Sequence, residues 1–92
     1  MATFVMLGRY SQEGLKNISA ARTRRAEKLV KKCRGKICCV YGLLGAYDVI
    51  VVADFPGVKE AMKASIGLAK LTGIGFVTSP AVSVEELDQL AG

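Results

Sequence analysis

Three residues have types and positions that could line a small polar pocket for a carboxylate or carbonyl ligand: Arg22, Tyr47 and Asp48. On a helical wheel of about 100° per residue, Arg22 falls in the middle of an apolar stripe, so its guanidinium should face the protein interior. The other members of that stripe are Leu15, Ile18, Ala26, Leu29 and Cys33. An unpaired buried charge costs several kcal/mol, and the only acidic residues between positions 28 and 59 are Asp48 and Asp54. We therefore expect either an Arg22–Asp48 ion pair that closes one end of the fold, or a polar pocket for a carboxylate or carbonyl ligand.

Other chemistry is restricted by composition. The chain has no histidine, the usual general base near neutral pH and the commonest transition-metal ligand. Its three cysteines, Cys33, Cys38 and Cys39, lack the C-x-x-C spacing of zinc or redox sites. We expect them to be reduced core residues, with a redox sensor as the less favoured alternative. Cys38 and Cys39 are neighbours on a predicted strand, so their side chains should point to opposite faces. We expect no cofactor and no metal, and enzymatic activity is disfavoured.

The net charge of +5 is concentrated in one region, because nine of the thirteen basic residues lie between Lys16 and Lys36. These residues could form a solvated helix face or a surface for nucleic acid or another polyanion. The solvated face is favoured, because no aromatic residue lies among the basic ones to stack on a base. If the chain did bind a polyanion, the residues involved would be Arg24, Arg25, Lys28, Lys31 and Lys32.

The elements that position these side chains follow from hydrophobic periodicity and from turn and cap residues. Strands are expected at 3–9, 36–41, 47–54 and 74–81, and helices at 12–33, 56–71 and 84–90. In the second helix the predicted core stripe is Val58, Met62, Ser65 and Ala69, flanked by Ala61 and Leu68. The order β-α-β-β-α-β predicts an α+β, ferredoxin-like domain over residues 1–92, with a four-stranded antiparallel sheet, two helices on one face and a short C-terminal helix.

Assembly is indicated by strands that are apolar on both faces. Residues 49–53 are five consecutive apolar residues, and 37–40 and 4–7 are similar. Two helices cover one face only, so a second copy packed sheet to sheet is the simplest cover for the other. No stretch is long enough to span a bilayer and no leader opens the chain, so we expect a cytoplasmic homodimer or higher oligomer.

The chain resembles the GYD domain family. The resemblance rests on Gly45-Ala46-Tyr47-Asp48 followed by Val49-Ile50-Val51-Val52, on Pro56 before the second helix, on residues 10–18 with Arg22 beyond them, and on the strand with Thr78. It covers nearly the whole chain and implies a dimeric α+β barrel fold.

Three classes of function remain as alternatives. The leading hypothesis is a small homo-oligomeric binding module that holds a small anionic ligand in a helix–sheet cleft. The alternatives are a cofactor-independent enzyme, suggested by other dimeric α+β barrels, and a polyanion binder that uses the basic first helix.

Overall fold

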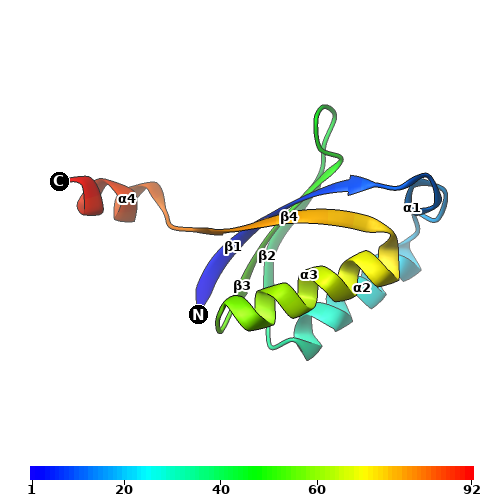
Figure 1. The fold of residues 1–92 in the computed structure, drawn as a ribbon, viewed down its shortest axis with the longest axis horizontal. Helices are drawn as coiled ribbons and strands as arrows, with labels where there is room; N and C mark the ends of the chain where they lie inside the picture. The colour runs from blue at the N-terminus through cyan, green and yellow to red at the C-terminus, as the bar shows by residue number, and fades with distance from the viewer.

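The computed structural model describes residues 1–92 as one α+β domain with an open, four-stranded antiparallel sheet and four helices (Figure 1). The strand order across the sheet is β2-β3-β1-β4. The elements are β1 (Ala2–Tyr10), α1 (Gln12–Lys16), α2 (Ala20–Lys32), β2 (Lys36–Gly42), β3 (Val49–Phe55), α3 (Val58–Thr72), β4 (Ile74–Ala81) and α4 (Val84–Ala91).

The core lies between the sheet and the two long helices, α2 and α3, which cover the same face (Figure 1). Alternate residues of the central strands face these helices, as the period of two in a strand requires. In β3, for example, Val49, Val51, Ala53 and Phe55 are buried and the residues between them are only half-buried. The continuous apolar run of β3 therefore supplies a core on one side and an apolar surface on the other.

The single helix expected at 12–33 is wrong, because the chain breaks between α1 and α2. Ser11 caps α1 by accepting a hydrogen bond from the Gly14 N–H, as expected for an N-cap. Ser19 caps α2 in the same way through the Arg22 N–H, at 3.0 Å. As a result Leu15 and Ile18, expected in the buried stripe, are exposed.

The second long helix is correctly located but its buried face is rotated from the predicted stripe. Gly73 ends α3 in the left-handed conformation, with φ of 72°, where glycine is favoured. The buried residues are Ala61 and Leu68, which were expected to flank the stripe, together with Ala64 and Thr72. Val58 and Met62, expected within the stripe, are exposed. Ala61 and Ala64 let α3 lie close to the sheet, and the larger apolar side chains Val58, Met62 and Ile66 remain exposed.

A register shift in β2 between Ile37 and Cys39 overturns the expected placement of the cysteines. Cys39 pairs with Val52, and the Cys38 thiol contacts the Asp54 carboxylate at 3.6 Å, so both lie on the side away from the helices. Cys38 is exposed and Cys39 half-buried; only Cys33 is a core residue. Loss of hydration and, next, the negative charge of Asp54 raise the pKa of the Cys38 thiol above its ordinary value.

The centre of the sheet face opposite the helices is apolar, and no other element of this chain lies on it. Its half-buried centre consists of Val5, Leu7, Ile50 and Val52, which alternate with the core residues of β1 and β3. The C-terminal helix α4 follows β4 but extends beyond the sheet at one end of the molecule (Figure 1), and all its residues are exposed. None of the four helices is long and apolar enough to cross a membrane.

Candidate functional site

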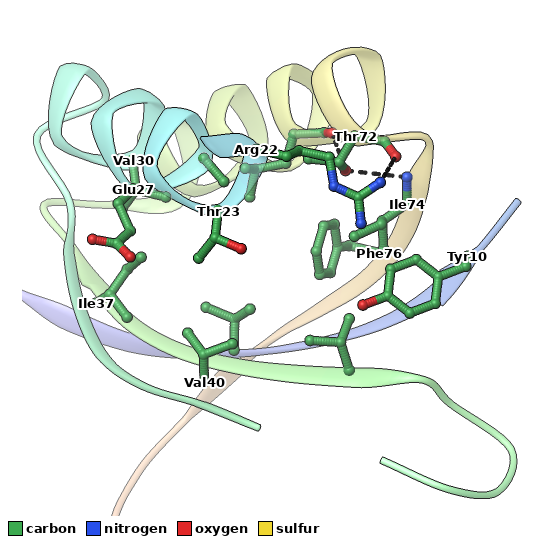
Figure 2. A pocket seen from close by; sticks show the side chains of 14 residues that line it. Tyr10, Arg22, Thr23, Glu27, Val30, Ile37, Val40, Thr72, Ile74 and Phe76 are labelled. Atoms are coloured by element: carbon green, nitrogen blue, oxygen red, sulfur yellow. Dashed lines mark hydrogen bonds between the residues drawn. The ribbon is translucent and has the colours of Figure 1, made fainter. Parts of the chain in front are cut away.

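A cavity of about 190 Å³ lies between α2, the C-terminal part of α3 and the sheet (Figure 2). Its lining is mostly apolar; the polar side chains are Tyr10, Arg22 and Thr72 at one end, and Thr23 and Glu27 from α2. The apolar part of the lining consists of Ala26, Val30, Ile37, Val40, Val49, Val51, Leu68, Ile74 and Phe76.

Arg22 occupies the closed end of this cavity with only 7% of its surface exposed, which confirms its predicted inward orientation. Its Nη1 donates hydrogen bonds to the carbonyl oxygens of Gly14 and Thr72, the latter at 3.3 Å. None of its hydrogen bonds goes to a carboxylate, so the predicted Arg22–Asp48 ion pair is wrong. Figure 2 shows that another nitrogen of the Arg22 guanidinium, which is not bonded to these carbonyls, points toward the cavity.

The carbonyls that hold Arg22 are positioned by a close contact between α1 and the end of α3. The Ser11 N–H donates to the Gly73 carbonyl at 3.1 Å, which ties the two segments together. Gly14 is required at this contact, because a Cβ there would lie 2.9 Å from the Thr72 carbonyl oxygen. The break between α1 and α2 lets Arg22 on α2 reach both carbonyls. The contact of α1 with the end of α3 therefore forms the closed end of the cavity.

Tyr10 completes the closed end and was missed by the sequence analysis. Its ring centroid lies 5.6 Å from Arg22 Cζ, and its hydroxyl points into the cavity (Figure 2). Asp48 Oδ2 accepts a hydrogen bond from the Tyr10 N–H at 2.9 Å, just beyond the last β1–β3 pair. Asp48 is therefore a positioning residue for Tyr10 rather than part of the cavity lining. The alternation of side chains along β1 could have identified Tyr10, since it lies on the same face of the strand as Phe4 and Met6.

Tyr47, the third predicted residue, lies outside the cavity lining. Its half-buried ring packs against the Arg9 guanidinium, whose Cζ lies 5.3 Å from the ring centroid. Tyr47 and Asp48 thus contact consecutive residues of β1, Arg9 and Tyr10. Tyr47 and Asp48, which directly precede β3, fix the end of β1 against β3 and so place Tyr10 beside Arg22.

The open end of the cavity is formed by exposed residues of α2 and β2, namely Thr23, Glu27 and Val40. The Glu27 carboxylate lies near Ile37, across the cavity from the Arg22 guanidinium (Figure 2). A ligand in the cavity would thus meet a positive charge at its inner end and a negative charge at the entrance.

The basic residues considered for polyanion binding lie elsewhere on α2. Arg24, Arg25, Lys28, Lys31 and Lys32 are all exposed, and none of them lines the cavity. No cluster of three or more His, Cys, Asp and Glu side chains is arranged to hold a metal ion.

Comparison with protein families identifies the chain's relationship. The family model for the GYD domain matches residues 4–91, so the chain belongs to the GYD domain family. The comparison with curated proteins finds no match.

Proposed function

We propose that this protein is a small homo-oligomeric binding module that holds a monocarboxylate with a compact apolar body in the cleft between α2 and the sheet. The observation that carries this proposal is the Arg22 guanidinium, buried at the inner end of a mostly apolar cavity and hydrogen-bonded to carbonyls from one nitrogen only. A guanidinium can donate paired hydrogen bonds to a carboxylate, and these are stronger than bonds between neutral groups.

The size and lining of the cavity support an apolar body of roughly the size of a benzene ring. An engineered cavity of about 150 Å³ binds benzene, and this one measures about 190 Å³. Branched and aromatic side chains from α2, β2, β3 and β4 would contact such a group on several sides. The Tyr10 hydroxyl, which points to the same region as the guanidinium, is a further donor for the ligand's oxygen.

The charge at the entrance favours a single negative charge on the ligand. Glu27 lines the entrance, so a second carboxylate at the outer end of a ligand would face a like charge. The proposal therefore favours monocarboxylates over dicarboxylates of the same length.

For the assembly we propose a ferredoxin-like arrangement that forms a dimeric α+β barrel through the open sheet face, in the cytoplasm. Two observations support it. Val5, Leu7, Ile50 and Val52 make the centre of that face apolar, and α4 does not cover it. Exposed apolar patches of this kind mark association surfaces on soluble proteins.

Calorimetric titration with benzoate, benzamide and terephthalate tests the ligand class. We expect benzoate to bind, with benzamide and terephthalate much weaker. The Arg22→Met variant should lose about 1.5–3 kcal/mol of benzoate binding, which is roughly 10- to 150-fold in Kd. Arg24→Met is the matched control, since Arg24 is exposed on the same helix and should leave binding unchanged. Equal affinity for benzoate and benzamide would refute the role of Arg22.

Sedimentation equilibrium tests the assembly. The wild-type chain should sediment at twice 9.8 kDa or more at micromolar concentration. Val52→Glu places a charge at the centre of the sheet face and should produce monomers. Val58→Glu, at an exposed apolar position on α3, should not. A wild-type monomer under these conditions would contradict the dimer.

A further inference from the structure

The outer surface of the helix layer carries a groove with an apolar floor and basic rims. It lies between α2 and α3, measures about 430 Å³, and has no strand residue in its lining, so it opens away from the sheet. The floor is formed by Leu29, Cys33, Ile66 and Gly67, and the rims by Lys32 on α2 and by Lys63 and Lys70 on α3.

Helix α4 has the complementary pattern. Val84, Leu87, Leu90 and Ala91 fall within about 120° of its circumference on a helical wheel, and the three large ones are exposed. Asp88 lies next to this stripe on one side and Glu86 on the other. Only Glu85, among the acidic residues of α4, points away from it, so the apolar stripe is flanked by a negative charge on each side.

The two surfaces also agree in length. At about 1.5 Å per residue, the distance from Val84 to Ala91 along α4 is roughly 10 Å, and so is the distance from Lys63 to Lys70 along α3. An amphipathic helix placed in an apolar groove is a common mode of recognition, and here the acidic flanks would meet lysines on both rims.

We propose that α4 of one chain docks into the α2–α3 groove of a second copy. Within one chain α4 projects beyond the sheet (Figure 1), and the connection from Ala81 at the end of β4 to Val84 at the start of α4 spans at most about 10 Å. Because β4 belongs to the sheet and the groove opens on the other side of the helix layer, a second copy is the accessible partner. This exchange is independent of the Arg22 cavity and does not require the proposed ligand.

Hydrogen–deuterium exchange of the α4 peptide, read by mass spectrometry, tests this docking in the full-length protein. An isolated helix of eight residues is marginal in water, so slow exchange in α4 requires a docking surface. We expect α4 amides of the wild-type protein to exchange at least about tenfold more slowly than those of a free peptide of the same sequence. Unprotected α4 amides would overturn the proposal.

Reversing the charges on α4 or on the groove distinguishes docking onto a second copy from docking within one chain. The tail variant Glu86→Lys/Asp88→Lys and the groove variant Lys63→Glu/Lys70→Glu should each lose α4 protection, while protection of the core strands stays unchanged. Refolded together as a 1:1 mixture, the two variants should regain it, because each tail then matches the groove of the other. Glu85→Lys is the control and should retain protection. Failure of the mixture to recover, or equal loss in Glu85→Lys, would refute docking between copies.

Discussion

Replacing a small residue of the cavity lining with a larger apolar one should raise the free energy of unfolding, because the added atoms fill empty space. Ala26 lies on α2, is half-buried and lines the cavity. Replacing it with leucine adds three carbon atoms, and each methylene group transferred from water contributes about 0.8 kcal/mol. Ordering the leucine side chain costs about 0.5–1 kcal/mol. Ala26→Leu should therefore stabilise the fold by about 1.5–2 kcal/mol, and it should abolish benzoate binding because its side chain occupies the same space.

Urea unfolding followed by circular dichroism measures this change. Protein concentration must be held fixed, since an oligomer is stabilised by mass action. Ala21→Leu is the matched control, because Ala21 is exposed on the same helix and should change stability by less than about 0.5 kcal/mol. If Ala26→Leu destabilises the fold by about 1–3 kcal/mol, as overpacking does, the space is not available and the reasoning fails.

Three further changes test the surroundings of the site. Gly73→Ala should cost about 1–2 kcal/mol in unfolding free energy because of the left-handed φ of 72°; an unchanged urea midpoint would contradict this. Asp48→Ala should weaken benzoate binding by loosening Tyr10, and Asp48→Asn, which keeps an acceptor oxygen, should restore it; equal binding by both would separate Asp48 from the site. Asp54→Asn should lower the raised pKa of Cys38, so that alkylation of this thiol by iodoacetamide begins at lower pH than in the wild type; an identical pH profile would show that the carboxylate has no effect.

The extents of the strands and of α3 were predictable because they depend on local patterns. The glycine stop at Gly73 and the apolar run of β3 both act within a few residues. The break after α1 was harder to foresee. The apolar period continued through positions 15 and 18, and it concealed the cap at Ser19 that actually begins α2.

The candidate site was predictable in part. The inward orientation of Arg22 follows from helical spacing alone, and the structure confirms it. Its hydrogen-bond partners do not follow from spacing, because two backbone carbonyls brought together by the Gly14 contact take the place of the expected carboxylate. Asp48 was correctly associated with this end of the fold, but it binds the backbone of Tyr10. Main-chain acceptors leave no mark in a sequence, so only the tertiary arrangement reveals them.

The most direct test of the central claim is a crystal structure of the protein with 4-bromobenzoate, in which anomalous scattering locates the bromine atom. The proposed site predicts a single major bromine peak among Ile37, Val40 and Val51, with the carboxylate within hydrogen-bond distance of the Arg22 guanidinium. Bromine peaks confined to the open sheet face or to the outer helix surface, with no density beside Arg22, would contradict it.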